Sequence, residues 1–295
     1  MKKSSFHFLS GDVELNWYQR GLYRLSAKLE YLTEQRCGLK GEVKSYKPVL
    51  DEKALVEAFG ERVIGSSPSR VLCFDYLLHA CSDILNDKRH ILDIGCGYGD
   101  YAAFIGQSNG YASYHGVDIS ERERWADYQN DKTTFATAVL GEDKINIDGI
   151  DTVFSQSVLE HVENDRAVFD CFTASKDCTV EHIHLIPPTR SFIEHRFHGF
   201  RRYGPCTINR LLSSPTIRDV EVTMIGNWLT RETHWEKAKK IKRNKAFGDR
   251  SKVPNFDHGK SLIANLIDRR DMMIPSEVTD AGFFVLRFKQ DVAGE

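Results

Sequence analysis

The feature that most constrains this chain is an apolar run that leads into a loop with glycine at every second position. The run and its loop are Ile91-Leu92-Asp93-Ile94-Gly95-Cys96-Gly97-Tyr98-Gly99. Glycine permits positive φ and carries no Cβ that would obstruct a ligand. Where such a loop opens onto a helix, the free N–H groups of the helix N-terminus favour an anionic group. The sequence therefore predicts a strand, a ligand-binding loop and a helix in this order.

Apolar runs and helical segments alternate from residue 90 onward. We predict strands at His90–Ile94, Tyr114–Asp118, 133–139, 151–155 and Thr179–Ile186, with helices at 100–108, 121–129 and 163–174 between them. Later segments add a short helix at Thr207–Leu212 and strands at Val220–Ile225 and Phe283–Phe288. This alternation predicts an α/β fold of the Rossmann-like, doubly wound type, with a mostly parallel sheet.

Two further segments flank this core. Residues 1–65 are expected to form a helical cap, with one helix at 12–35 and a second at 51–59 that Asp51 caps and Gly60 ends. Residues 66–295 form the main domain, which begins with an amphipathic helix at 70–85. Within it, the polar and basic segment 231–275 is expected to be an insertion that contains some helix.

Two acidic residues stand at positions that suit a nucleoside-like ligand. Asp93 lies just before the glycines, where a carboxylate suits a cationic group such as an amine. Asp118 ends the next predicted strand, where a carboxylate can accept hydrogen bonds from a ribose diol. Either acid alone is compatible with a turn or a helix cap, but both together around a glycine loop indicate a binding site.

At these residues the chain resembles a known superfamily. The segment LDIGCGYGD is similar to the glycine-rich motif of class I S-adenosylmethionine-dependent methyltransferases, and Asp151–Val162, which ends in VLEHV, is similar to their fourth-strand segment. The resemblance covers roughly 88–225, with 283–290 as a final strand. It implies methyl transfer from S-adenosyl-L-methionine but no particular acceptor.

The resemblance also implies roles for individual residues. Asp93 would hold the amino group of the cofactor, Asp118 the ribose, and Ile119 would pack on the adenine. The remaining cofactor-binding residues that it implies are Gly95, Cys96, Gly97, Gly99, Ser155 and Gln156. The chain departs from the family after the third strand, where Phe135-Ala136-Thr137-Ala138-Val139 lacks the acid that often meets the adenine. Thr137 or a backbone group would then take that place.

Transfer to an alcohol requires a general base, and histidine is the usual choice. We name His161, His184 and His195 as candidate catalytic residues. His161 stands in the family motif, although in many relatives that histidine is structural. His182 shares a strand face with His184, so either can also be a packed core residue.

The segment from Pro187 to Tyr203 follows the fifth strand, at the edge of the sheet where such folds bind ligands. It is rich in arginine, histidine and aromatic residues, which suit an anionic, ring-containing acceptor. We name as candidate substrate-binding residues Arg190, His198, Arg201 and Tyr203. The alternative is a solvated loop with aromatic anchors.

We expect the acceptor pocket to be closed by the N-terminal segment 10–64 on one side and by loop 187–204 on the other. The N-terminal segment is not expected to be needed to complete the sheet. We also expect no metal requirement, because the ends of the fourth and fifth strands, Ser155-Gln156-Ser157 and Leu185-Ile186-Pro187, carry no carboxylate.

The net charge of −2 disfavours a nucleic-acid partner. The tetrapeptide Asp/Asn-Pro-Pro-aromatic, which is typical of DNA amine methyltransferases, does not occur in the sequence, and its absence disfavours that function. The basic run Lys237–Lys245 suits contact with membrane headgroups at the periphery, with nucleic acid or with a polyanionic glycan, and is otherwise a solvated helix face. The seven scattered cysteines, and a start without the apolar core of a signal peptide, favour free thiols in the cytoplasm.

The function that these observations favour is methylation of an oxygen of a small or sugar-like acceptor, phosphate-bearing ones included, in glycan or secondary-metabolite biosynthesis. Two alternatives remain open. One is a methyltransferase for nucleic acid or protein, and the other is a non-catalytic module that binds the cofactor. The intact Asp93, Asp118 and glycines disfavour the non-catalytic module.

Overall fold

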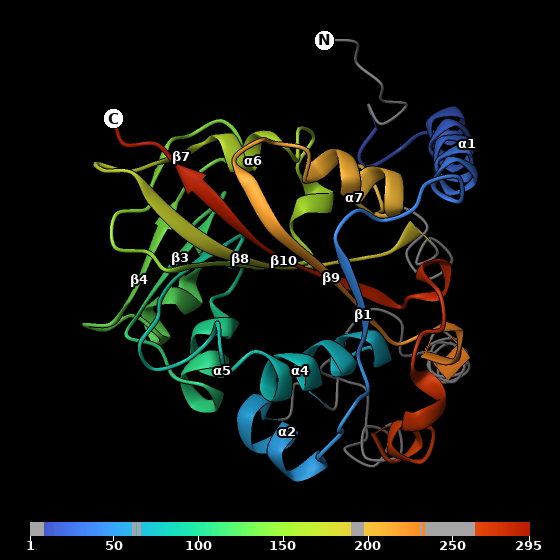
Figure 1. The fold of residues 1–295 in the computed structure, drawn as a ribbon, viewed down its shortest axis with the longest axis horizontal. Coiled ribbons are helices and arrows are strands. Elements are labelled where there is room, and N and C mark those ends of the chain that lie inside the picture. The colour runs from blue at the N-terminus through green and yellow to red at the C-terminus, as the bar shows by residue number, and fades with distance from the viewer. Residues whose placement is uncertain (1–8, 61–62, 64–65, 190–197, 231, 234–262) are drawn as a thin grey trace.

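The structure is a computed structural model that describes residues 9–60, 63, 66–189, 198–230, 232–233 and 263–295 of the chain (Figure 1). Several predicted features lie outside these residues. They are Arg190, His195, the basic run 237–245 and most of the insertion 231–275.

The core of the molecule is one eight-stranded sheet in the order β1-β9-β10-β8-β6-β2-β3-β4. These strands are β1 (Glu42–Ser45), β9 (Ile217–Ile225), β10 (Phe283–Val292), β8 (Cys178–Ile186), β6 (Thr152–Gln156), β2 (His90–Ile94), β3 (Ser113–Asp118) and β4 (Thr133–Thr137). Only β10 runs antiparallel to its two neighbours; every other pair is parallel. The predicted Rossmann-like, mostly parallel α/β fold is confirmed.

Helices cover both faces of this sheet (Figure 1). One face carries α2 (Glu52–Phe59), α4 (Pro68–Ala80) and α5 (Asp100–Ser108). On the other face lie α6 (Ala167–Asp170) and α7 (Pro205–Leu211), with α1 (Trp17–Glu34) beside α7. Each face has its own apolar core, as expected for a sheet that is buried on both sides.

Two of the predicted helices are largely absent. The helix expected at 121–129 is a short 3-10 turn, η1 (Glu123–Asp127). The helix expected at 163–174 is confined to α6. The chain becomes extended after it, because β7 (Phe172–Thr173) pairs in parallel with β5 (Ile145–Asn146). The other short 3-10 turns in the part of the chain that the structure describes are η2 (Leu159–His161), η5 (Arg270–Met273) and η6 (Val278–Asp280).

The N-terminal segment contributes to the sheet, contrary to expectation. Strand β1 pairs in parallel with β9, so residues of the predicted cap form one edge of the sheet. All four β1 residues are exposed, so no apolar alternation marks the strand in the sequence. The segment is also tied to α4, because the buried Asp75 carboxylate accepts hydrogen bonds from Val49 N (2.8 Å), Leu50 N (2.7 Å) and the Tyr46 hydroxyl (2.9 Å).

A disulfide joins Cys37 to Cys206, which corrects the expectation that all seven cysteines are free. The other five are unpaired thiols. The bridge forms because the end of α1 lies against the start of α7, where Glu34 accepts hydrogen bonds from the backbone of Cys206 (2.6 Å) and Thr207 (3.0 Å). A separation of 169 residues hides this contact in the sequence.

Candidate active site

The glycine loop crosses from the end of β2 to the start of α5. Gly95, Gly97 and Gly99 all have positive φ, at 72°, 56° and 79°. A Cβ on Gly95 would strike Val158, and one on Gly99 would strike Phe135, so both glycines are required by protein packing. A Cβ on Gly97 would meet nothing within 4 Å. Only Gly97 therefore presents bare backbone to open space, as a ligand cradle requires.

A cavity of about 550 Å³ opens in front of this loop. It lies between the loop, α5 and the helices α2 and α4, and its volume is in the range of small-molecule sites. The described residues that line it are Ala58, Phe59, Ser66, Arg70, Phe74, Asp93, Gly95, Cys96, Gly97, Tyr98, Asp100, Tyr101, Ala103, Phe104, Gln107, Tyr128 and Gln156. The sequence motifs predict the loop side of this cavity but not its α2 and α4 side. The amphipathic helix predicted at 70–85 is α4, which ends at Ala80 and is buried on nearly every side from residue 68 to 77, so its sequence pattern does not mark a cavity wall.

Asp93 lines the cavity from the end of β2 and is only 1% exposed. The Tyr114 hydroxyl donates a hydrogen bond to its carboxylate. Burial, with a smaller contribution from the charge of Asp118, raises the pKa of Asp93 to about 8. A carboxyl group held this way gains most from a cationic partner, which fits the predicted role toward an amino group.

Asp118 lies beside the glycine loop but is not among the lining residues. Its Oδ2 accepts a hydrogen bond from Gly97 N at 2.8 Å, and its Oδ1 lies 3.8 Å from Nη2 of Arg122. The indole of Trp125 donates to Gly97 O at 2.8 Å, so both polar groups of Gly97 are held. Ile119, the next residue along the chain, is 69% exposed, so its side chain can pack on an adenine ring as the sequence predicts.

Gln156 and Ser155 end β6 and point to opposite faces of the sheet. Gln156 lines the cavity, where its Oε1 accepts a hydrogen bond from Tyr101 and its Nε2 has no partner among the described residues. Ser155 instead bonds the buried His184 Nδ1 at 2.7 Å, on the side away from the cavity. The assignment of Ser155 to the cofactor is therefore corrected, because strand alternation turns it into the core.

His184 is a core residue and not a catalytic base. It is fully buried. Its Nδ1 bonds the Ser155 hydroxyl, and its Nε2 contacts His182 Nδ1 at 3.0 Å. Burial lowers the pKa of His184 to about 3, so the ring is neutral. Both ring nitrogens are engaged within the protein, which leaves none for an acceptor.

Arg201 and Tyr203 are also structural. Both surround the buried Asp165, with Arg201 Nη1 at 3.1 Å from Oδ1 and the Tyr203 hydroxyl at 3.2 Å from Oδ2. Arg210 completes the group with Nη2 at 2.9 Å from Oδ2. Arg201 also donates to Val162 O at 2.8 Å. These contacts tie the segment after β8 to the turn after β6, so neither residue is available to a substrate.

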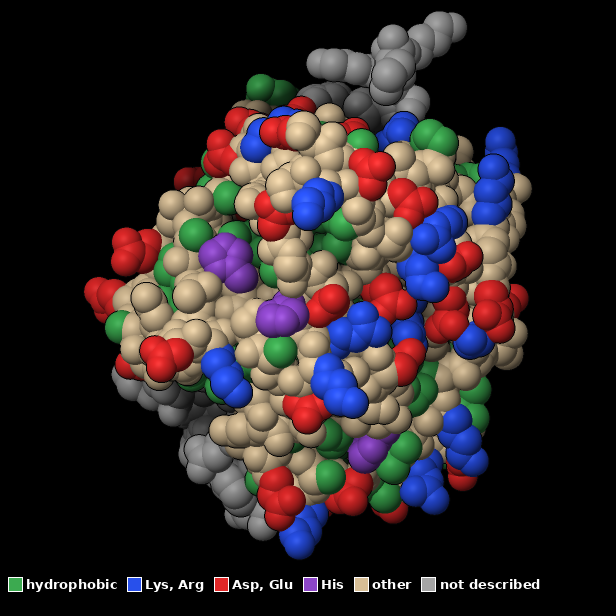
Figure 2. Space-filling model, turned by 60° about the vertical axis from the view of Figure 1, so that its left-hand side comes forward, with side chains coloured by type: hydrophobic (Ala, Val, Ile, Leu, Met, Phe, Trp, Pro, Cys, Tyr) green, Lys and Arg blue, Asp and Glu red, His purple; other side chains and the backbone are tan. Residues whose placement is uncertain are grey.

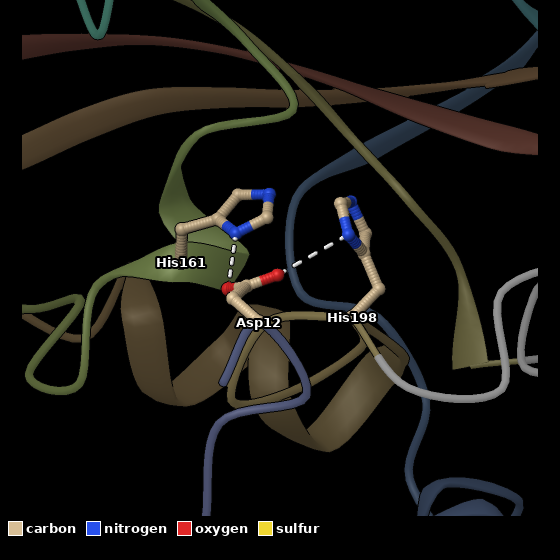
Figure 3. Close-up of side chains that lie close together, drawn as sticks. All are labelled: Asp12, His161 and His198. Carbon is tan, nitrogen blue, oxygen red and sulfur yellow. Dashed lines mark hydrogen bonds and ion pairs between the residues drawn. The ribbon is translucent and has the colours of Figure 1, made fainter. Parts of the chain in front are cut away.

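His161 and His198 meet on a shared carboxylate that the sequence analysis did not identify (Figure 3). His161 Nδ1 lies 2.7 Å from Asp12 Oδ2, and His198 Nδ1 lies 3.3 Å from Asp12 Oδ1. Burial by itself would raise the pKa of the Asp12 carboxylate, but the hydrogen bonds from the two histidines hold this pKa well below its usual range. Neither histidine lines the described part of the cavity. Asp12 stands in no motif, so no sequence signal marked it.

The surface carries no strong charge of one sign on the face drawn in Figure 2, where acidic and basic side chains are interspersed outside the grey residues. None of the helices in the described ranges combines the length and apolar character needed to cross a bilayer. The mixture of acidic and basic side chains on that face agrees with the small net charge of −2.

Comparison with known proteins supports the interpretation of the loop. Residues 92–175 match the family model described as a methyltransferase domain. This stretch, less than half of the chain, includes the glycine loop, Asp118 and Gln156. The match agrees with the methyltransferase domain that the sequence predicts over these residues. No curated protein matches the chain.

Solved structures resemble the chain at low identity. A phosphoethanolamine N-methyltransferase 2 from Haemonchus contortus, in complex with S-adenosyl-L-methionine, is 16% identical over 81% of this chain and 56% of its own, with a TM-score of 0.47. A putative sarcosine dimethylglycine methyltransferase from Galdieria sulphuraria is 13% identical over 83% and 98%, with a TM-score of 0.49. A [4+2]-cyclase is 14% identical over 88% and 100%, with a TM-score of 0.46. The chain spans under two thirds of the length of the Haemonchus contortus structures, 56% and 60%.

Proposed function

We propose that this protein transfers a methyl group from S-adenosylmethionine to an oxygen of a small, anion-bearing acceptor. The observation that carries the proposal is the cavity itself, in which Asp93, Gly97 and Gln156 form one wall and Arg70, Phe59 and Phe74 the other. The first wall suits the cofactor and the second suits an acceptor with an apolar body and a negative group.

The first wall matches the polar end of the cofactor. Asp93 would hold the ammonium, and the unpartnered Gln156 Nε2 would donate to the carboxylate or to the acceptor. The open space at Gly97 would let the chain of the cofactor pass close to the backbone. When bound, the cofactor supplies an electrophilic methyl group on a sulfonium.

The second wall argues for the acceptor class. Arg70 is the one cation among the described lining residues, and it lies one helical turn from Phe74 on the same face of α4. Phe59 stacks between Phe74 and Phe104, with centroids 3.9 and 3.3 Å away, so this wall is a rigid aromatic surface that excludes water. A cavity of about 550 Å³ suits a small molecule better than a nucleic-acid or protein segment.

No histidine lines the described part of the cavity, and burial raises the pKa of Tyr101 beyond the range of a general base. Of the two lining carboxylates, Asp100 pairs with Arg124 at 3.2 Å, and Asp93 is occupied by the cofactor ammonium in this proposal. We therefore infer an acceptor oxygen that is ionised or acidic at neutral pH, such as a carboxylate. For a carboxylate, the C–S bond breaks as the C–O bond forms, the electron pair stays on sulfur, and the two charges cancel without proton removal.

The test uses isotopically labelled S-adenosylmethionine and three acceptor pools: small carboxylates and phosphates, neutral sugars, and RNA. We expect label in the first pool. Arg70→Ala should raise KM for the acceptor at least ~10-fold while the Kd of S-adenosylmethionine stays unchanged. The matched control is Arg218→Ala on the exposed β9 surface. Labelling of RNA alone, or equal effects of both variants, would contradict the proposal.

A further inference from the structure

The Asp12, His161 and His198 cluster belongs to neither wall of the cavity, and the proposed methyl transfer does not use it. Its members come from three separate segments: Asp12 precedes α1, His161 ends η2 and His198 lies after β8. Their ligand atoms, one from each side chain, all lie within 4.8 Å of one another. Figure 3 shows the carboxylate between the two imidazole rings.

We propose that Asp12, His161 and His198 bind one divalent transition-metal ion. Two imidazoles and one carboxylate suit zinc, iron(II) and similar ions, whereas magnesium and calcium prefer oxygen ligands alone. Ligand atoms that lie about 2.1 Å from one ion are separated from each other by roughly 3 to 3.5 Å. The contacts of 2.7 and 3.3 Å from Asp12 to the two rings differ little from this spacing.

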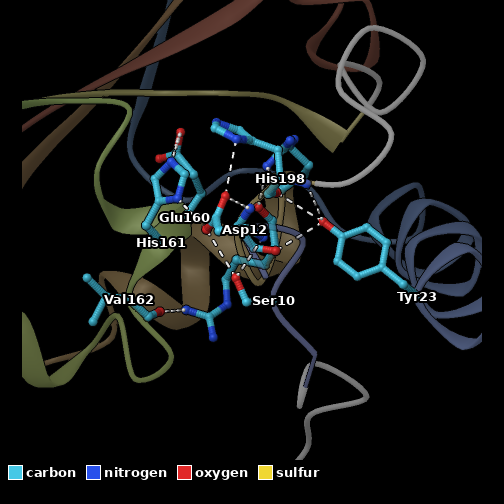
Figure 4. Close-up of polar contacts among 10 residues, drawn as sticks. Ser10, Asp12, Tyr23, Glu160, His161, Val162 and His198 are labelled. Atoms are coloured by element: carbon cyan, nitrogen blue, oxygen red, sulfur yellow. Dashed lines mark hydrogen bonds and ion pairs between the residues drawn. The ribbon is translucent and has the colours of Figure 1, made fainter. Parts of the chain in front are cut away.

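Glu160 supplies an independent indication. Its side chain is 1% exposed, and neither carboxylate oxygen has a hydrogen-bond partner among the described residues. Oε1 lies 3.9 Å from Nε2 of His161, on the side of the ring opposite Asp12 (Figure 4). Histidines that bind a metal through one nitrogen commonly present the other to a carboxylate, which orients the ring and increases its basicity.

The cluster is already held in place by its surroundings. Gly199 N and the Ser10 hydroxyl donate to the Asp12 carboxylate at 3.0 and 3.1 Å. The Tyr23 hydroxyl, from α1, donates to the carbonyl oxygens of His198 (3.0 Å) and Gly199 (3.1 Å). The three ligands are therefore positioned before an ion arrives, and the ion would join the segment before α1 to the turn after β6.

The test is calorimetric titration of the full chain, prepared without an affinity tag, with zinc. We expect one zinc per chain, no binding of magnesium, and with cobalt(II) visible bands without thiolate charge transfer. His161→Ala and His198→Ala should each weaken zinc binding at least ~100-fold. Glu160→Gln should weaken it about 10- to 100-fold, as for other outer carboxylates.

His90→Ala is the matched control, because His90 is an exposed histidine whose ring contacts the Ser113 hydroxyl, away from Asp12, His161 and His198. It should leave zinc binding unchanged. Asp12→Asn, which keeps the size of the side chain, serves if an alanine variant fails to fold, and should also weaken binding. Absence of stoichiometric zinc, or zinc binding that survives the Asp12, His161 and His198 variants, would overturn the proposal and leave Asp12 as a carboxylate that only bonds two histidines.

Discussion

The Tyr114 hydroxyl donates a hydrogen bond to the Asp93 carboxylate at the wall of the cavity. Tyr114 is on β3 and Asp93 on the adjacent β2, and both side chains are almost completely buried. One hydrogen bond does not replace the water that an ionised carboxylate loses on burial. Asp93 is therefore held at a cost to folding, as expected of a group whose partner is a ligand.

We predict that Asp93→Asn stabilises the free protein and weakens cofactor binding. The pKa of Asp93 rises from 3.8 to about 8 on folding, so the folded state holds this proton more tightly than the unfolded state. Stability should thus fall as pH rises from about 4 to 8 and level off above. At pH 9 the variant should be more stable by on the order of a few kcal/mol.

Urea unfolding of both proteins between pH 6 and 9, with calorimetry of S-adenosylmethionine binding, checks this. The gap in unfolding free energy should widen up to about pH 8, and the variant should bind at least ~10-fold more weakly. Equal affinity would remove Asp93 from the cofactor site, and a gap that is constant with pH would show that its charge has no part in stability.

Gly97 gives a second prediction, with a matched control at Gly149. Both have positive φ, 56° and 75°, and both have open space where a Cβ would be. Gly97→Ala and Gly149→Ala should therefore lose a similar ~1 kcal/mol of stability from backbone strain. Only Gly97→Ala places a methyl group in the cavity, so it alone should weaken S-adenosylmethionine binding, by at least ~10-fold. Equal binding by the two variants would mean that the cofactor does not approach Gly97.

Much of the fold could be predicted because its signals are local. The limits expected for His90–Ile94, the helix 100–108 and the helix at 51–59 with Asp51 as its cap all agree with the structure to within a residue. Buried parallel strands are short apolar runs, and helix N-caps are single residues, so both can be recognised from one short stretch of sequence. Asp93, Gly97 and Gln156, which the sequence predicts to bind the cofactor, line one cavity for the same reason: each belongs to a local strand-and-loop motif.

The rest depended on contacts between distant segments. Strand β1 is an exposed edge whose only reason to be extended is β9, about 175 residues later. His184 differs from a catalytic histidine only in what surrounds it, and Asp12 becomes informative only beside His161 and His198. Arg201 was assigned to an anionic substrate, but it pairs with the buried Asp165 of its own chain. Residue type alone does not distinguish an internal ion pair from a ligand site.

The corrected role of His184 leads to a third prediction. His184→Ala should lower the free energy of unfolding by about 2 kcal/mol or more, since it opens a cavity and leaves the Ser155 hydroxyl and a ring nitrogen of His182 without their partners. The Kd of S-adenosylmethionine should not change at a temperature where the variant is folded. His115→Ala, on β3, is the control for histidine loss. A large loss of transfer rate with unchanged stability would restore a catalytic role.

The last prediction concerns the N-terminal segment. Removal of residues 1–64 should unfold the protein, because it deletes β1, exposes the core around Leu55 and Phe59, and leaves the buried Asp75 carboxylate without the Tyr46, Val49 and Leu50 donors. A buried charge that loses its partners costs several kcal/mol, a large part of the stability of a typical domain.

Removal of residues 1–16 is the matched control. It stops before α1 and keeps β1, α2 and every donor to Asp75, so this protein should fold and bind S-adenosylmethionine with unchanged affinity. Circular dichroism and thermal unfolding separate the two deletions. Cooperative unfolding after loss of residues 1–64 would contradict the prediction, and would make the N-terminal segment a lid over the cavity that the sheet does not need for folding.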